Sequence, residues 1–182
     1  MSEALHQDAV EVLTRWSSCD PDQTQLQHDF LDFLGEHPAG VLRECRIGHI
    51  TASGLVMDAA RTSVLLTLHP KVGRWLQLGG HIETDDASVR DAALREAVEE
   101  SGLPAGLLQI AAEPVCVDRH LVPCGPGPMS QHLDVQFLVT AERRVAPVRS
   151  AESDDLRWFT LDNLPPDLDA SVLRLIRQSL DA

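Results

Sequence analysis

The stretch that most constrains this chain is Gly79 to Leu103, GGHIETDDASVRDAALREAVEESGL. A short apolar strand, Trp75 to Leu78, leads into its two glycines, and a helical pattern follows over Asp86 to Ser101. At about 100° per residue, three carboxylates fall in one narrow sector of that helix: Glu96, Glu99 and Glu100. An adjoining apolar stripe can face a sheet: Ala93, Leu94, Ala97 and Val98. The pattern predicts a strand, a glycine turn and a helix with a crowded acidic side.

The crowded carboxylates favour a divalent cation. Like charges one helical turn apart destabilise a helix, and a bound cation removes that conflict. Mg²⁺ and Mn²⁺ prefer oxygen ligands and are often held by a few carboxylates together with substrate phosphates. A charge run on a helix is also the usual mark of a solvated face, which is the alternative. The adjacent glycines favour the metal, because they let backbone carbonyls approach an ion or ligand closely.

The same stretch resembles the signature of the nudix hydrolases: a Gly, five residues, an acid, seven residues, then Arg-Glu-apolar-any-Glu-Glu-any-Gly-apolar. Arg95 to Leu103 match the second half, with the small Ala97 in an apolar position. Gly80 and Asp86 match the first half, with Asp in place of Glu. Eight residues rather than seven separate Asp86 from Arg95, so Ala87 takes the position of the acid. We interpret this as a one-residue insertion at the start of the helix.

The resemblance implies both a fold and an activity. The fold is an α/β (α+β) sandwich of helices around a mixed β-sheet. The activity is hydrolysis of the diphosphate linkage in a nucleoside diphosphate derivative, with Mg²⁺ as cofactor and Mn²⁺ as its substitute. No subgroup marker outside the signature narrows the nucleotide derivative further.

The resemblance also implies a role for each matched residue. Glu99 and Glu100 would be the principal metal ligands, and the Gly79 carbonyl would complete the coordination. Glu96 would bind metal or accept a proton from the attacking water. Arg95 lies one turn before Glu99 and would orient a carboxylate. The expected catalytic group is therefore Arg95, Glu96 and Glu99.

A further metal ligand is expected ahead of the last strand, because nudix members often add one acid from a later loop. Glu152 is the candidate, six positions before Trp158, and Asp154 is its rival. An ordinary exposed loop acid is the alternative for Glu152.

Histidines are frequent, with eight in 182 residues. His81 follows the glycine pair directly. Asp118 and His120 share one face of a predicted strand, as do His132 and Asp134 on another. These side chains could converge as a pocket wall for phosphate or base, or as a subsidiary metal site; hydrogen bonds along each strand face are the alternative. The expected substrate contacts are Gly80, His81, His120 and His132.

The N-terminal part predicts a helical hairpin over residues 1–40, packed on a nudix domain over residues 41–182. Its helices run from Ala4 to Ser18 and from Pro21 to about Gly35, with Asp20 as N-cap and Gln23 completing a capping box. Further strands are predicted at Ile50–Met57, Ser63–Leu68, Val115–His120, His132–Thr140 and Leu156–Leu161. A final helix is expected to bury Val172, Leu173, Ile176 and Leu180.

Composition excludes several classes of protein. Fifteen Lys and Arg against 28 Asp and Glu give a net charge of −13, which argues against nucleic acid as a partner. No apolar run of about 18 residues is present, so no membrane partner is expected. The N-terminus has no export signal, and the four cysteines contain no Cys-x-x-Cys pair. A cytoplasmic protein is predicted.

Two other functions stay open. A catalytically silent nudix fold would sense a nucleotide, although such proteins usually lose the box glutamates that this chain keeps. An isoprenoid diphosphate isomerase would need a Cys facing the substrate, for which Cys116 is the strand-borne candidate. A homodimer through the N-terminal hairpin is also possible.

Overall fold

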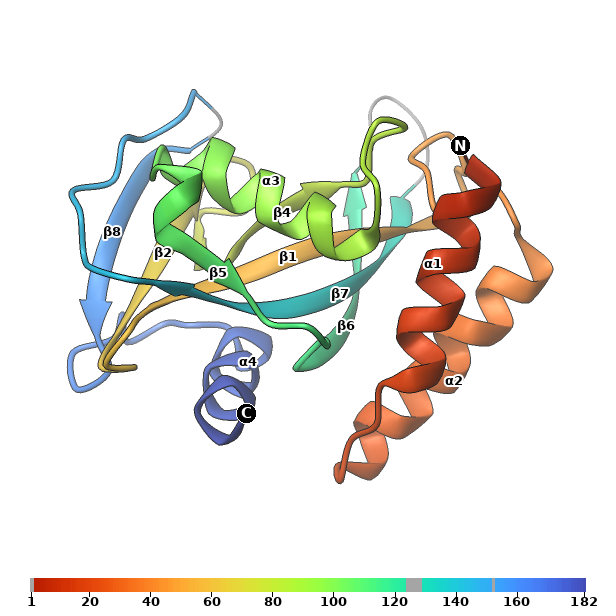
Figure 1. The fold of residues 1–182 in the computed structure, drawn as a ribbon, viewed down its shortest axis with the longest axis horizontal. Helices are drawn as coiled ribbons and strands as arrows, with labels where there is room; N and C mark the ends of the chain where they lie inside the picture. The colour runs from red at the N-terminus through yellow and green to blue at the C-terminus, as the bar shows by residue number, and fades with distance from the viewer. Residues whose placement is uncertain (1, 124–128, 152) are drawn as a thin grey trace.

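The computed structural model describes residues 2–123, 129–151 and 153–182, and its centre is a mixed β-sheet with helices on both faces (Figure 1). The main strand order is β3-β2-β1-β7-β5, while β4 pairs with β1, β6 with β7 and β8 with β2. The strands are β1 (Gly48–Asp58), β2 (Ser63–His69), β3 (Arg74–Leu76), β4 (Leu78–His81), β5 (Leu108–Ile110), β6 (Cys116–Pro123), β7 (Met129–Ala141) and β8 (Asp155–Thr160). β1 and β7 are parallel and the other pairs antiparallel. The predicted α/β sandwich is confirmed.

The helices are α1 (Ser2–Arg15), α2 (Pro21–Glu36), α3 (Val89–Ser101) and α4 (Ala170–Asp181), with a short 3-10 turn at Ala105–Leu107. α3 begins three residues later than the sequence pattern predicts, because the Ser88 side chain caps it by accepting from the Asp91 amide. It ends at Gly102, whose φ of 62° is a left-handed conformation that glycine adopts without strain. No described helix is long and apolar enough to cross a membrane.

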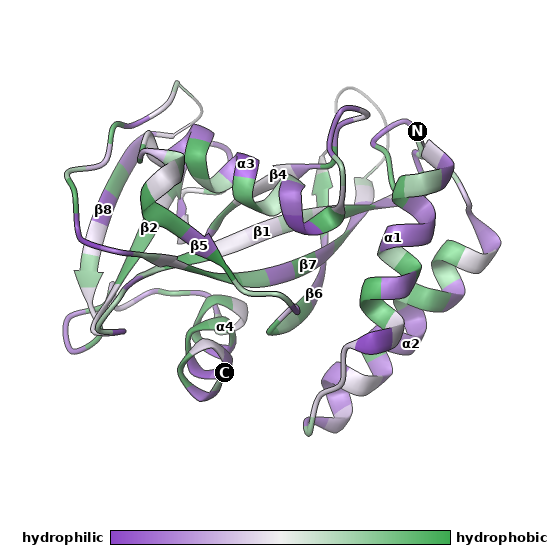
Figure 2. Cartoon of the chain, viewed as in Figure 1, coloured by the Kyte–Doolittle hydropathy of each residue, from purple (hydrophilic) through white to green (hydrophobic). Residues whose placement is uncertain are grey.

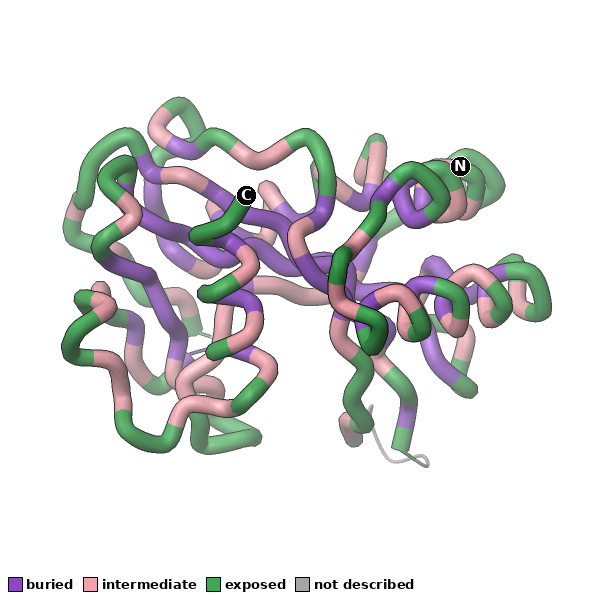
Figure 3. Tube along the Cα trace, turned by 90° about the horizontal axis from the view of Figure 1, so that it is seen from below, coloured by how far each residue is buried: buried purple, intermediate pink, exposed green. Residues whose placement is uncertain are grey.

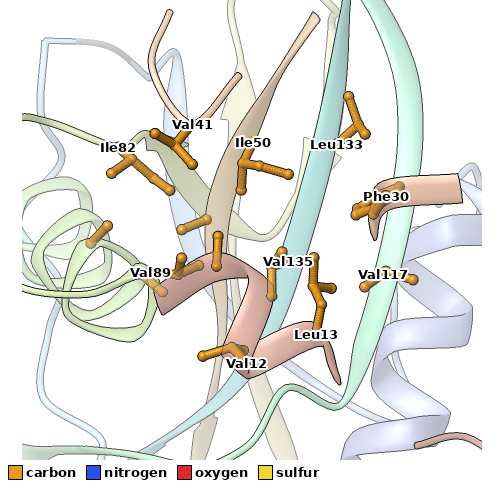
Figure 4. Packing of buried hydrophobic residues seen from close by; sticks show 14 of the residues in the cluster. Val12, Leu13, Phe30, Val41, Ile50, Ile82, Val89, Val117, Leu133 and Val135 are labelled. Atoms are coloured by element: carbon orange, nitrogen blue, oxygen red, sulfur yellow. The ribbon is translucent and has the colours of Figure 1, made fainter. Parts of the chain in front are cut away.

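The core lies on both sides of the sheet. One cluster joins α1, α2 and the start of α3 to β1, β6 and β7, and Figure 4 shows Val12, Leu13, Phe30 and Val89 meeting Ile50 and Val135 there. A second cluster packs α4 against the opposite face. Hydrophobic residues run through the strands, while the helices alternate between hydrophobic and hydrophilic positions (Figure 2). Buried backbone follows the central strands, and exposure concentrates in the connecting loops (Figure 3).

Gln23 does not complete a capping box. Asp20 caps α2 by accepting from the Asp22 amide, whereas the Gln23 side chain is buried and faces β6. Its Nε2 donates to the Val117 carbonyl at 3.0 Å, and its Oε1 accepts from the Val117 amide at 2.8 Å. Gln23 therefore bonds both backbone polar groups of Val117, which fixes the hairpin to the sheet.

Two further polar contacts hold the hairpin. Gln27 Nε2 donates to the Leu13 and Trp16 carbonyls at the end of α1, at 2.6 and 2.7 Å. The Asp8 carboxylate accepts from the Val89 amide at 2.7 Å, at the first residue of α3. The apolar side of the hairpin is thus occupied by this chain's own sheet and α3. The homodimer stays a prediction.

The sequence pattern predicted two of the buried residues of α4, Val172 and Ile176, correctly and two others wrongly. Leu173 and Leu180 are both 41% exposed, and the residues that face the sheet are Val172, Leu175, Ile176 and Ser179. Positions 172, 175, 176 and 179 follow a 3.6-residue period, so the helix is rotated slightly from the predicted orientation. Leu173 and Leu180 instead line a shallow apolar groove with Leu161 and Leu164.

Candidate functional site

Gly79 and Gly80 lie within β4 and not in the turn that the sequence pattern predicted, because both pair with β1, and a Cβ at either position would meet a neighbouring residue. A Cβ on Gly80 would lie 2.7 Å from Glu96 Oε1, so the Glu96 carboxylate packs directly on the strand backbone. A Cβ on Gly79 would lie 2.3 Å from the Cβ of Ser53 on β1. The Gly79 amide donates to Glu100 Oε2 at 3.1 Å. The close approach of α3 to β4 therefore depends on Gly80, and the pairing of β4 with β1 depends on Gly79.

Arg95 joins the acidic residues of α3 to the preceding loop. Its Nε and Nη2 donate to the two Asp86 oxygens, each at 2.9 Å, in a bidentate pair. Nη2 also donates to the His81 carbonyl at 2.9 Å, and Nη1 to Glu96 at 2.9 Å and Glu99 at 3.2 Å. Asp86 reaches Arg95 because it lies in the turn before α3, where the extra residue of the signature is absorbed.

The electrostatics of this pair follow from its contacts. Burial alone would raise the pKa of the Asp86 carboxyl, but hydrogen bonds from Arg95 and the Glu83 amide outweigh it and hold that pKa below its usual range. The hydrogen bond to Asp86 is the main reason that the pKa of Arg95 rises further above its usual value. Both groups are therefore charged at neutral pH.

The oxygen donors fit a hard divalent cation. One guanidinium, that of Arg95, faces Asp86, Glu96 and Glu99, and Glu100 lies one position further along α3. The Glu99 side chain is 60% exposed, whereas that of Glu96 is 13% exposed. Excess negative charge on carboxylate oxygens, partly open to solvent, suits Mg²⁺ or Mn²⁺.

The later loop holds the two acids predicted as a further metal ligand, Glu152 and Asp154. Glu152 lies outside the described residues. Its rival Asp154 is exposed, and its amide donates to the Leu68 carbonyl at 2.9 Å. The assignment of either acid as a ligand stays a prediction.

A polar face crosses the sheet beside Gly79 and Gly80 of β4. Strand register places His49 opposite His132, His132 opposite His120, and Thr51 opposite His81. The His49 ring centroid lies 5.0 Å from that of His81 and 4.7 Å from that of His132, and the His81 and His132 centroids lie 5.2 Å apart. His120 adds a fourth ring, 5.5 Å from His132. The structure thus brings together the three histidines predicted from sequence.

Burial sets the charge of these imidazoles. It lowers the pKa of His81 to about 4 and that of His132 to about 3, and it also lowers the pKa of His49. His120 differs, because its hydrogen bond to Asp118 raises its pKa. At neutral pH the three inner rings are neutral.

The two aspartates of this face have separate partners. Asp118 Oδ2 lies 3.1 Å from His120 Nδ1, so this pair forms the strand-face hydrogen bond weighed as an alternative. Asp134 is buried and accepts hydrogen bonds from Thr51, Ser53, Gln77 and Gln136. Asp134 therefore anchors a hydrogen-bond network across β1 and β7.

Sequence reasoning missed His49, which is 1% exposed. A signal was present: His49, Thr51 and Ser53 alternate with apolar residues on a strand that is buried along its whole length. Polar residues at every second position of such a strand mark one polar face. The partners of His49 are distant in the sequence, so only the strand register identifies them.

Comparison with known proteins decides the family. The model of the NUDIX domain matches residues 48–178, which include α3 and the whole sheet with the two glycines of β4. This chain belongs to the NUDIX family. The resemblance drawn from residues 79–103 is confirmed, and its second half is the segment that forms the Arg95 and glutamate arrangement.

Curated relatives within the family match over part of their length. The NAD-capped RNA hydrolase NUDT12 of Homo sapiens is 33% identical over 92 residues, and that of Macaca fascicularis matches equally. The match covers 50% of this chain and 17% of either relative.

Solved structures share the fold. A NUDIX family hydrolase from Clostridium perfringens has a TM-score of 0.55 at 24% identity, covering 73% of this chain and 96% of its own. RenU, a Nudix hydrolase from M. smegmatis, has a TM-score of 0.53 at 22% identity, covering 75% and 84%. The NUDIX domain of Shewanella oneidensis NrtR, solved with ADP ribose, has a TM-score of 0.52 at 22% identity, covering 74% and 87%.

Proposed function

We propose that this NUDIX protein is a divalent-metal-dependent hydrolase that cleaves the diphosphate linkage of a nucleoside diphosphate derivative. One observation carries the proposal: Arg95 holds Asp86, Glu96 and Glu99 together while Glu96 packs on Gly80. A solvated acidic face would not need glycine at that contact or a bidentate arginine pair in front of it.

Glu96, Glu99, Glu100 and the Gly79 carbonyl would hold Mg²⁺, for which Mn²⁺ would substitute. When bound, the metal neutralises the diphosphate charge and lowers the pKa of an attacking water. The residues of the chain set the geometry. Arg95 keeps the Glu96 and Glu99 carboxylates in place, and the Gly79 amide keeps Glu100 in place. Glu96, the least exposed of the Arg95-bound glutamates, is the proposed proton acceptor.

The histidine face beside the glycines of β4 would contribute to substrate binding. His81 follows Gly80 directly, and His120 is partly exposed at the outer end of the cluster. The names of a relative and a structural neighbour refer to NAD and ADP ribose, and both of these molecules contain a diphosphate linkage. These names support a nucleotide diphosphate derivative as substrate class and nothing narrower.

The isomerase alternative has little support from the site. Cys116 is fully buried, and its thiol donates to Gln23 Oε1 at 3.1 Å beneath the hairpin. Burial also raises the pKa of this thiol. The strand-borne candidate is therefore not accessible to a carbon skeleton bound beside Gly79 and Gly80. The silent nucleotide sensor stays as the second candidate, and it differs from the hydrolase only in turnover.

The test is a product-release assay against a panel of nucleotide diphosphate derivatives with Mg²⁺ or Mn²⁺. We expect turnover of at least one compound, and a loss of about 100-fold or more in Glu99→Gln and in Glu100→Gln, as when a transition-state contact is removed. Arg119→Gln, which changes the partner of Asp29 on α2, is the matched control and should keep full activity. Nucleotide binding without turnover would replace the hydrolase by the sensor.

A further inference from the structure

His49, His81 and His132 form a compact nitrogen cluster contributed by three strands. Each offers a ring nitrogen, and these three atoms lie within 4.8 Å of one another. His49 comes from β1, His81 from the end of β4 and His132 from β7, so the rings belong to neighbouring strands of a rigid sheet. His49 is buried and the other two are half-buried, so the cluster opens toward the surface on one side.

Two of the ring nitrogens have no hydrogen-bond partner although they are buried. These are Nε2 of His49 and Nε2 of His81. His49 Nδ1 lies 3.3 Å from the Cys45 carbonyl oxygen, which can only accept, so the hydrogen is on Nδ1. In the neutral ring Nε2 then carries a lone pair. A buried lone pair without a donor is costly and needs an explanation.

The contact to Cys45 is also the arrangement that supports metal binding. Histidines that bind metals usually donate their other ring N–H to a carbonyl or carboxylate, which fixes the tautomer and the ring orientation. Neutral imidazole nitrogens suit Zn²⁺, Co²⁺ and related transition metals, whereas Mg²⁺ prefers oxygen. With Zn–N bonds of about 2.0–2.1 Å, tetrahedral ligand atoms lie about 3.4 Å apart. Small ring rotations therefore suffice to bring the three nitrogens into range.

We propose that His49, His81 and His132 form a three-nitrogen site for a transition-metal cation of the Zn²⁺ type, with its fourth position open on the side of His120. The site is separate from the oxygen donors of α3 and does not depend on the proposed hydrolase function. The two are linked through one residue, because the His81 carbonyl accepts from Arg95 while its ring belongs to the cluster. Stacked rings of a substrate pocket would explain the proximity of the histidines but not the two unpartnered nitrogens.

The test titrates the chelator-treated full chain with Co²⁺, and separately with Zn²⁺, in buffer with excess Mg²⁺ to fill the carboxylate group. We expect one equivalent of Co²⁺ to give visible absorption that Zn²⁺ abolishes. Zn²⁺ should also shift the ring ¹⁵N resonances of His49, His81 and His132, a readout on the unmodified protein. His81→Gln and His132→Gln should each weaken Co²⁺ binding by more than 10–100-fold, which is the cost of losing a hydrogen-bond partner of a metal ligand.

Matched controls separate this site from its neighbours. His120→Gln removes an adjacent ring outside the three ligands, and Glu99→Gln removes an oxygen donor of α3; both should bind Co²⁺ as the parent does. Zn²⁺ should raise the unfolding temperature of the parent and of these controls, but not of His81→Gln. Absence of Co²⁺ binding, or binding that survives both ligand substitutions, would overturn the site. Loss of Co²⁺ binding in Glu99→Gln, with binding retained in His81→Gln and His132→Gln, would also overturn the histidine site.

Discussion

At the scale of single residues, the site requires a glycine without a Cβ as well as the side chains that contact one another. Gly80 has no Cβ, and the space is taken by the Glu96 carboxylate. Arg95 is equally specific, because its planar fork reaches both Asp86 oxygens and the His81 carbonyl together. A lysine has one ammonium point charge and cannot reproduce those contacts. The geometry at this site therefore favours glycine at position 80 and arginine at position 95.

Substituting the two glycines separates activity from stability. In Gly80→Ala the new Cβ meets the end of a flexible side chain, so we expect Glu96 to shift and hydrolysis to fall by about 10–100-fold with a small loss of stability. In Gly79→Ala the Cβ meets the Ser53 Cβ and, at 2.6 Å, its Cα, so the paired strands must separate. We expect that variant to lose about 1–3 kcal/mol in urea unfolding. Equal unfolding midpoints for the two variants would contradict this assignment.

At the scale of elements, the Gln23 side chain attaches the helical hairpin to β6. It bonds the Val117 amide and carbonyl, as the backbone of a neighbouring strand would do. Gln23→Ala leaves the buried Val117 amide without its Gln23 acceptor and the Val117 carbonyl with the weak Cys116 thiol donor at 3.8 Å, and we expect a loss of about 1–3 kcal/mol in denaturant unfolding. Gln25→Ala is the matched control on the same helix, because Gln25 bonds only an exposed Asp29 side chain. Its effect should stay within about 0.5 kcal/mol. Similar losses in both variants would show that the contact to β6 is not what stabilises the hairpin.

The turn between β1 and β2 depends on one carboxylate. Asp58 accepts from the Thr62 and Ser63 amides and the Thr62 hydroxyl. Burial alone would raise its pKa, but these bonds and Arg144 outweigh it, so the pKa of Asp58 is lowered. This stabilisation is complete above the unfolded pKa of about 3.9 and is lost as the pH falls through the lower folded value. Asp58→Ala should cost about 1.5–3 kcal/mol in urea unfolding at pH 7, with a smaller difference near pH 3.

The control for that turn is an acid without such contacts to the backbone. Asp162 lies exposed after β8. Asp162→Ala should change the unfolding free energy by less than about 0.5 kcal/mol at either pH. A cost at Asp58 that did not change between the two pH values would mean that packing, and not the charged acceptor, stabilises the turn.

Periodicity predicted most of these elements because their apolar patterns are local. The hairpin helices, β1, β2, β6, β7, β8 and α4 lie within a few residues of their predicted bounds. β5 was missed because its three residues are too few to show a period, and β4 was merged with β3. The sequence does not reveal the role of Gln23, because a glutamine in the first turn of a helix is compatible with a capping box and with a tertiary contact. A local sequence pattern does not show whether a side chain bonds its own helix or a distant strand.

At the scale of the whole molecule, one part of the candidate site comes from a local sequence pattern and the other from contacts between distant segments. The carboxylates of α3 were predictable because one helix turn and one signature hold them. The histidine cluster depends on the parallel register of β1 and β7, which pairs His49 with His132. No local pattern specifies that register, so the cluster's third member, His49, appeared only with the fold. A sheet that joins distant segments is therefore what completes the polar face.

The molecule as a whole should also respond to magnesium. Asp86, Glu96 and Glu99 face one arginine beside α3, so a bound cation relieves repulsion between carboxylates in the folded state alone. Mg²⁺ at about 100 times its Kd should add about 2.7 kcal/mol to the free energy of unfolding. Thermal unfolding in Mg²⁺ and in NaCl of equal ionic strength separates this from screening. The double variant Glu99→Gln and Glu100→Gln should lose the Mg²⁺ increment, whereas His81→Gln should keep it. An increment that NaCl reproduces would mean that the acidic side of α3 is a solvated face and not a metal site.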